Sequence, residues 1–188
     1  LFMKEAQELR AGNTVKMGND LFIILKAIYN KGARGASSVK MKMKNLSTGS
    51  VSETVYRASD KFDQVILENK QMQFLYETNG FYTFMDQETY EQMDLNKDDL
   101  GDALHYLKEE MVIDVIVYGT KAVGVELPAQ VDTKITYTEP AVKGDTSGKV
   151  LKAATIETGY EVMVPLYCVI GDKIRINTQT DEFVSRAN

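Results

Sequence analysis

One arginine, Arg34, stands alone in a run of small residues, Gly-Ala-Arg-Gly-Ala-Ser-Ser, from position 32 to 38. The run separates an apolar segment, 21–29, from a segment of alternating Val, Lys and Met, 39–46. Glycine and small side chains favour a loop between two strands. We therefore expect Arg34 to project alone from the tip of a hairpin. A solvated loop arginine without a role is the simpler alternative.

The segment after this loop predicts a basic surface. Successive side chains of a strand point to opposite faces, so Lys40, Lys42 and Lys44 would share one face. Met41 and Met43 would then point to the core. This arrangement predicts a hairpin with a basic side next to its arginine tip.

The distribution of charge agrees with such a surface. Residues 1–66 carry 11 basic and 6 acidic side chains (+5), residues 67–131 carry 4 and 13 (−9), and residues 132–188 carry 7 and 8 (−1), which sum to −5. A basic first third favours phosphate binding there, whereas nucleic acid would avoid the acidic middle third. Ordinary variation in charge among small domains is the alternative explanation.

Several kinds of catalytic chemistry are disfavoured by the composition. With one cysteine, Cys168, the chain can form no internal disulfide, and with one histidine, His105, it has no multi-histidine metal site. The acidic residues 94–102 lack the spacing of a calcium loop, and a helix start explains them. Residues 143–148 lack the pattern of a phosphate-binding P-loop. We expect no metal, no cofactor and no enzyme activity.

An aromatic group in the middle third has two interpretations. Its members could stack bases, as in barrels that bind single strands. They surround Asn79-Gly80, the dipeptide of a two-residue hairpin turn, in an acidic setting, so we favour a barrel core with Leu75 opposite Phe84. The group comprises Phe74, Tyr76, Phe81, Tyr82 and Phe84.

Short apolar segments broken by Gly, Asn, Asp and Pro predict an all-β chain of three small barrels, 3–66, 67–131 and 132–188, of which the second and third pack together. The predicted strands are 14–17, 21–29, 39–46, 51–56, 73–78, 81–85, 112–118, 122–127, 131–138, 150–156, 161–164, 167–170 and 173–177. The spacing of Leu100, Ala103, Leu104 and Leu107 predicts one short helix in the middle domain, 98–107, with Asp98 or Asp99 as its N-cap. Leu1 and Phe2 precede the first methionine, and we expect the fold to begin after them.

The longest apolar run, 21–25, is far shorter than the roughly 20 residues of a membrane span, and no signal-peptide pattern is present at the start. We expect a cytoplasmic monomer without a membrane partner.

From Met3 to Asn188 the chain resembles bacterial elongation factor P. The resemblance is carried by residues 6–12 (AQELRAG), 39–46 (VKMKMKNL) with Thr48-Gly49, and 137–150 (YTEPAVKGDTSGKV). A C-terminal signature adds the spacing of Lys152, Ala154, Gly159, Val162, Val164, Pro165 and Gly171. Cys168 stands where that family has an aliphatic residue, which we interpret as a core substitution.

The resemblance implies an SH3-like (KOW-type) N-terminal barrel and two OB-fold barrels in an L similar to tRNA. It also implies a factor that binds the 70S ribosome beside the peptidyl-tRNA and rescues synthesis stalled at proline runs by positioning the CCA end of the tRNA. The tip of the first domain, here Arg34, would lie near the peptidyl-transferase centre. The ribosome would carry out the peptidyl transfer itself.

The resemblance further implies a role for each site residue. Many relatives carry a modified lysine at the tip, whereas an arginine there resembles the type that an arginine rhamnosyltransferase modifies, so rhamnose on Arg34 is expected. Contacts with tRNA and ribosomal RNA are expected from Lys31, Gly32, Arg34, Gly35, Lys40, Lys42 and Lys44. Contacts with tRNA or the small subunit are expected from Gly144, Asp145, Thr146, Phe183 and Arg186. Phe183 replaces the usual tyrosine and lacks its hydroxyl.

Two alternatives to this function remain at this point. A paralogue of the same superfamily would serve other stalling motifs. A general RNA-binding protein with OB and SH3 domains would need a basic OB surface, which the −9 middle third disfavours.

Overall fold

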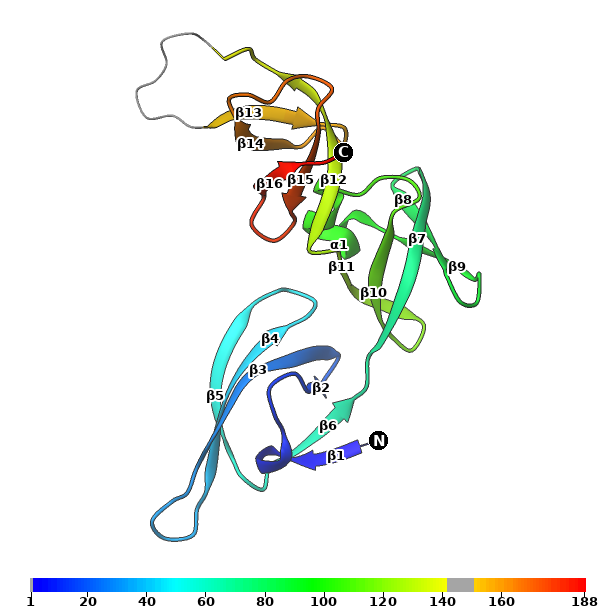
Figure 1. The fold of residues 1–188 in the computed structure, drawn as a ribbon. Helices are drawn as coiled ribbons and strands as arrows, with labels where there is room; N and C mark the ends of the chain where they lie inside the picture. The colour runs from blue at the N-terminus through cyan, green and yellow to red at the C-terminus, as the bar shows by residue number, and fades with distance from the viewer. Residues whose placement is uncertain (1, 142–150) are drawn as a thin grey trace. The chain divides into compact units, whose positions relative to one another are not determined.

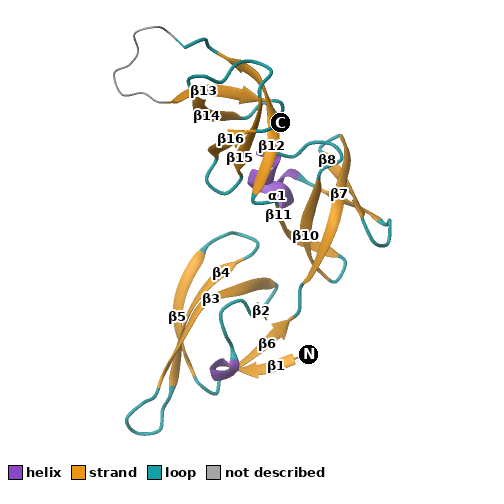
Figure 2. Ribbon diagram, viewed as in Figure 1, coloured by secondary structure: helices purple, strands orange, loops and turns teal. Residues whose placement is uncertain are grey.

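The computed structural model describes residues 2–141 and 151–188. In this part of the chain it contains β-strands, short 3-10 turns and one four-residue α-helix (Figure 1; Figure 2). The all-β fold class with a short helix in the middle domain is therefore confirmed. The chain divides into two compact units, Leu1–Glu68 with Val117–Val123, and Asn69–Ile116 with Gly124–Asn188.

The N-terminal sheet has six strands in the order β1-β6-β2-β3-β4-β5. Its strands are β1 (Phe2–Glu5), β2 (Thr14–Met17), β3 (Asp20–Asn30), β4 (Ser38–Asn45), β5 (Val51–Arg57) and β6 (Lys61–Val65). A 3-10 turn, η1 (Ala6–Glu8), follows β1. The core contains Leu9, Val15, Ile24, Met41 and Met43, all at most 1% exposed. The sheet begins with Phe2, which pairs with Gln64, so the expectation that the fold starts after this residue was wrong.

Strands β3 and β4 form the long hairpin that carries the tip, and one irregularity sets its register. Ile24 pairs with Met43, but Lys26 pairs with Lys42, so Leu25 is an extra residue in β3. This β-bulge turns Lys26 outward while Ile24 stays buried.

The second sheet has the order β11-β10-β7-β8-β9. Its strands are β7 (Glu68–Thr78), β8 (Phe81–Asp86), β9 (Gln92–Leu95), β10 (Val112–Tyr118) and β11 (Lys121–Glu126). Asn79 and Gly80 have φ of 52° and 82°, which confirms the predicted tight hairpin turn. The predicted pairing of Leu75 with Phe84 was wrong: a bulge lies between Phe74 and Tyr76, and Phe74 pairs with Phe84.

The predicted ten-residue helix is shorter and begins earlier. Helix α1 covers Lys97–Leu100, and a 3-10 turn, η2, follows over Gly101–His105. The N-cap is Asn96, not Asp98 or Asp99 as predicted. The side chain of Asn96 accepts a hydrogen bond from the N–H of Asp99. Gly101 has φ of 51°, outside the helical region, and therefore ends the α-helix. The apolar spacing continues past Gly101, which is why it predicted a longer helix.

The C-terminal strands form a closed barrel, β12-β13-β14-β16-β15. Its strands are β12 (Gln130–Thr138), β13 (Leu151–Ile156), β14 (Glu161–Pro165), β15 (Lys173–Asn177) and β16 (Glu182–Arg186). The strand predicted at 167–170 is wrong, because these residues form the turn between β14 and β15. There Cys168 is buried, while Tyr167, Val169 and Ile170 are exposed, and burial raises the pKa of the Cys168 thiol.

Side chains from η2 and the residue after it pack against this barrel. Tyr106 belongs to the apolar core of the C-terminal barrel, and its hydroxyl donates to a carboxylate oxygen of Asp181. Tyr160 donates to the other oxygen of Asp181 at 2.9 Å, and its ring stacks on His105 with centroids 3.9 Å apart. The expected packing of the second domain against the third is confirmed.

No helix in the described part of the chain is long and apolar enough to cross a membrane.

Candidate nucleic-acid interface

Arg34 lies in a seven-residue loop that the β3–β4 hairpin holds at its end. The last strand pair is Asn30 with Ser38, which leaves 31–37 as the loop (Figure 1). Tyr29 donates its hydroxyl to the hydroxyl of Ser37 at 2.8 Å, which closes the base of the loop. Arg34 is exposed, and no described residue forms a hydrogen bond or an ion pair with its side chain. Its guanidinium is therefore available to a partner.

Two glycines shape the loop around Arg34. A Cβ on Gly32 would lie 2.0 Å from the carbonyl oxygen of Ala36, so only glycine fits there without moving the backbone. Gly35 has φ of 87°, in the region that favours glycine. The two glycines that the resemblance assigned to RNA contacts thus have a structural role in forming the tip, and Lys31 beside them is exposed.

The predicted basic face is present on β4. Lys40, Lys42 and Lys44 are exposed, while Met41 and Met43 are buried, as the alternation predicted. The sequence analysis missed Lys26, which pairs with Lys42 across the hairpin because of the bulge at Leu25. No pattern in the sequence marks that bulge, since it lies inside a continuous apolar segment.

An acidic residue on the neighbouring strand β5, Glu53, borders this basic face. Glu53 pairs with Lys42 and forms an ion pair with Lys40 at 2.9 Å. The hydrogen bond from Lys40 lowers the pKa of Glu53, and the positive charges of Lys40, Lys42 and Lys26 act in the same direction. Because like charges opposite each other repel, Glu53 offsets the repulsion between Lys26 and Lys42. Lys44 has no acidic partner among the described residues.

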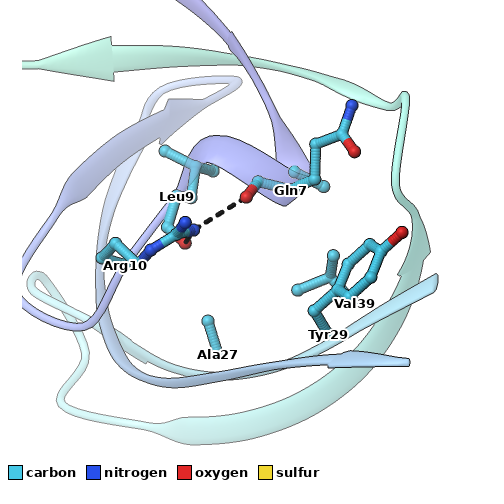
Figure 3. A pocket seen from close by; sticks show the side chains of 7 residues that line it. Gln7, Leu9, Arg10, Ala27, Tyr29 and Val39 are labelled. Carbon is cyan, nitrogen blue, oxygen red and sulfur yellow. Dashed lines mark hydrogen bonds between the residues drawn. The ribbon is translucent and has the colours of Figure 1, made fainter. Parts of the chain in front are cut away.

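A pocket opens on the other side of the same hairpin (Figure 3). It measures about 400 Å³ and is lined by Leu9, Arg10, Ala27, Tyr29 and Val39, together with Ala6 and Gln7. Nη1 of Arg10 donates to the carbonyl oxygens of Gln7 and Leu9 at 2.7 and 2.9 Å. Arg10 therefore satisfies the carbonyl groups of the turn after β1, and these contacts support a structural role.

Two of the five predicted C-terminal contact residues, Phe183 and Arg186, lie on β16. Phe183 is half-buried and packs against the core of the C-terminal barrel. Nη2 of Arg186 donates to the carbonyl oxygen of Tyr167 at 2.8 Å and to Asp172 at 3.1 Å, and its guanidinium lies over the Tyr167 ring. Arg186 thus holds the β14–β15 turn and retains 49% side-chain exposure. Gly144, Asp145 and Thr146 lie outside the described residues.

The chemistry that this arrangement offers is binding. Within residues 2–141 and 151–188 no group of three or more His, Cys, Asp or Glu residues could hold a metal ion. The first unit instead presents an exposed guanidinium and a row of ammonium groups, which suit phosphate oxygens.

Comparisons with known proteins give one consistent result along the chain. Family models match three segments: "Elongation factor P (EF-P) KOW-like domain" at residues 5–62, "Elongation factor P (EF-P) OB domain" at 67–125, and "Elongation factor P, C-terminal" at 131–186. The chain is 54% identical to elongation factor P of Bordetella avium over 186 residues, which are 99% of this chain and all of the relative. It is 53% identical to elongation factor P of Fusobacterium nucleatum over 184 residues, 98% of both chains.

A solved structure supports the fold. The eukaryotic translation initiation factor 5A from Methanococcus jannaschii aligns with a TM-score of 0.54 at 19% identity. The alignment covers 68% of this chain and 92% of that one.

Proposed function

Because the chain belongs to the elongation factor P family, it is a translation elongation factor, and we propose that it acts by placing Arg34 beside the end of a peptidyl-tRNA on the 70S ribosome. The factor would thereby promote peptide-bond formation where synthesis stalls at runs of proline. The observation that carries the proposal is the exposed guanidinium of Arg34 at the end of the β3–β4 hairpin, next to a row of lysines.

The mechanism is one of positioning. Phosphates of tRNA or ribosomal RNA would bind Lys42 and Lys44, and Lys26 extends the same surface across the bulge. The tip loop then approaches the reacting ends without supplying an acid, a base or a nucleophile. Holding two reactants in a reactive geometry lowers the entropic part of the barrier, and the ribosome makes the peptide bond. Proline is a poorly oriented nucleophile and gains most from such help.

A sugar on Arg34 would extend the reach of the tip. A dedicated glycosyltransferase would join the anomeric carbon of a nucleotide-activated deoxyhexose, rhamnose, to a guanidinium nitrogen. The C–N bond forms as the C–O bond to the nucleoside diphosphate breaks, and the nitrogen loses one proton. The added hydroxyl groups can donate to and accept from a tRNA backbone. The small residues around Arg34 leave space for this group.

The test is translation of a reporter that contains consecutive prolines, with a proline-free reporter as control. In a host that cannot lysylate the protein, Arg34→Lys should lose the proline-specific stimulation although it keeps the charge, because the transferase acts on a guanidinium. Mass analysis of the Arg34 peptide from the native host should show one deoxyhexose.

Arg34→Ala is the companion variant. It should fold normally, since an exposed loop arginine without partners contributes less than about 0.5 kcal/mol to stability. It should also still bind ribosomes through the rest of the chain. If Arg34→Lys and unmodified wild-type protein both have full activity on the proline reporter, charge at the tip suffices. The proposed role of the modification would then be rejected.

A further inference from the structure

A single side-chain hydrogen bond closes the loop that carries Arg34. The hydroxyl of Tyr29 donates to the hydroxyl of Ser37 at 2.8 Å across the end of the β3–β4 hairpin. Within the described part of the chain, no other side-chain hydrogen bond or ion pair reaches residues 31–37. The direction in which Arg34 projects therefore depends on few contacts, and this bond is one of them.

The bond joins a strand residue to a loop residue. Tyr29 belongs to β3 and pairs with Val39 of β4, and its ring lies beside Val39 on one wall of the pocket in Figure 3. The sheet thus places the Tyr29 side chain. Ser37 precedes Ser38, the first paired residue of β4, and so belongs to the loop. The hydroxyl of Tyr29 therefore fastens the loop to a position that the sheet has fixed.

The backbone of Ser37 is held by a second contact. Its carbonyl oxygen accepts from the N–H of Ala58, in the turn after β5, at 2.9 Å. The carbonyl oxygen of Ala58 accepts in turn from the N–H of Gln7 in η1 at 3.1 Å. Ser37 is thus linked to the body of the N-terminal sheet through its side chain and its main chain.

Arg34 lies three residues before this fixed point. On the other leg of the loop, Gly32 lies so close to Ala36 that a Cβ would be 2.0 Å from the Ala36 carbonyl oxygen. Because the two legs are in contact, a shift of Ser37 would move both of them. Without the Tyr29 hydroxyl, Arg34 would adopt more directions, of which only a fraction suits one target, and the rate of the assisted step would fall by that fraction.

The bond contributes little to the stability of the sheet. Tyr29 is 51% exposed and Ser37 is half-buried. Water replaces a hydrogen bond between two partly exposed hydroxyl groups when the bond is broken, so its loss leaves no buried group unpaired. A variant without this bond should therefore fold normally, and its effect can be measured at the tip.

We propose that Tyr29 is a positioning residue for Arg34: its hydroxyl, acting through Ser37, holds the tip loop in the conformation that directs the guanidinium at the end of the peptidyl-tRNA. The inference rests on the proposed function. Lys42 and Lys44 would provide affinity, whereas Tyr29 acts on the step that follows binding. The lysines and the tyrosine should therefore control two different measured quantities.

The rate of peptide-bond formation on ribosomes stalled at consecutive prolines, measured against factor concentration, separates these quantities. Rates are compared at an equal modified fraction of Arg34, determined by mass analysis. Tyr29→Phe removes the hydroxyl and keeps the ring. It should lower the rate at saturating factor about three- to tenfold, the loss that corresponds to one hydrogen bond, and change the concentration for half-maximal rate less than twofold.

Variants of the acceptor test whether one bond is responsible. Ser37→Ala should show the same loss as Tyr29→Phe, and the double variant should be no worse than either single variant, because each removes the same contact. Ser37→Thr keeps a hydroxyl and should retain the wild-type rate. Additive losses in the double variant would overturn the proposal.

Two residues of the same types serve as matched controls. Tyr76 is 48% exposed, and its hydroxyl forms no hydrogen bond within the described residues. Ser38 is the neighbour of Ser37, and its hydroxyl is likewise without a hydrogen-bond partner there. Tyr76→Phe and Ser38→Ala should both retain the wild-type rate at saturation.

NMR order parameters of the loop amides test the positioning on the free full chain, without ribosomes. In Tyr29→Phe the values at residues 33–36 should fall below those of wild type, while those of β3 and β4 stay the same. Unchanged values in the loop would overturn the proposal. So would a higher half-maximal concentration with an unchanged saturating rate, which would make Tyr29 a binding contact.

The rate measurement also distinguishes this inference from the proposed function. If wild type and Tyr29→Phe stimulate synthesis at consecutive prolines equally, the positioning role is wrong and the proposed function stands. If wild-type protein gives no stimulation, the proposed function is wrong and the positioning role falls with it.

Discussion

Tyr106 donates its hydroxyl to Asp181, which links the segment after η2 to the C-terminal barrel, and only 3% of the Tyr106 residue is exposed. Hydrogen bonds to charged groups contribute about 1.5 to 3 kcal/mol when buried. Tyr106→Phe removes this bond and should lower the free energy of unfolding by an amount in this range, measured in urea. Asp181→Asn should also be destabilising, because it weakens the bonds of both Tyr106 and Tyr160.

The same hydrogen bond predicts a dependence on pH. Burial, followed by the bond to Asp181, raises the pKa of the Tyr106 hydroxyl above its ordinary value of 10.0. A raised pKa in the folded state gives stability that is complete below pH 10 and is lost as the pH rises above it. The stability difference between wild type and Tyr106→Phe should therefore shrink from pH 8 to pH 11. A difference that stays constant over this range would contradict the assignment.

The basic face should bind RNA through phosphates. Each phosphate contact adds about 0.7 to 0.9 to the slope of log affinity against log salt concentration. Replacing Lys40, Lys42 and Lys44 together with alanine should lower both the affinity for 70S ribosomes and this slope. Unchanged affinity and slope would refute the role of this face.

Glu53 provides the matched control for that experiment. Glu53→Gln removes the negative charge that pairs with Lys40 and keeps the size of the side chain. It should increase ribosome affinity at low salt, because Lys40 is then free for phosphate. A decrease would mean that the ion pair positions Lys40 for binding instead of competing with it.

The aromatic hairpin of the second sheet should be structural. Phe84 is fully buried and its ring lies 5.3 Å from that of Phe74, so Phe84→Ala should cost about 3 to 5 kcal/mol in thermal or urea unfolding. Phe81 on the same strand is 56% exposed, and Phe81→Ala should cost less than about 0.5 kcal/mol. Loss of RNA binding by Phe84→Ala with intact stability would favour a base-stacking platform.

The shape of the tip should matter independently of its charge. Gly32→Ala would place a methyl group against the backbone of Ala36 and force the loop to move. We expect reduced sugar transfer and reduced activity on the proline reporter, with Arg34 still present. Ala33→Ser, a change of similar size at an exposed neighbour, serves as the control and should retain both activities.

Patterns that depend on local chemistry could be predicted from the sequence. The alternation of Lys and Met gave the two faces of β4, and Asn79-Gly80 gave the hairpin turn, because each depends on neighbouring residues alone. The bulges at Leu25 and Leu75 could not be predicted, since they arise from the twist and packing of paired strands. For this reason Lys26 was missed and the partner of Phe84 was misassigned.

Apolar spacing alone also failed at two other places. Leu100, Ala103 and Leu107 are buried as the helical spacing required, yet Gly101 breaks the α-helix between them. At 167–170 the apolar residues Val169 and Ile170 are exposed in a turn that Asp172 and Arg186 hold. The exposed position of Arg34 at the hairpin tip could be predicted from the sequence, because it depends only on the small residues around it.

The extra residue at Leu25 bears on which changes in length β3 can tolerate during evolution. From Lys26 to Asn30 every side chain owes its orientation to this single insertion, because strand faces alternate with each residue. Loss of the extra residue would turn Lys26 inward and turn Ala27, which packs against the core, outward. Loss of two would shorten the hairpin and keep both faces. Viable descendants of this sequence should therefore differ from it in this segment by even numbers of residues. The length of the hairpin that carries Arg34 would then change in steps of two residues.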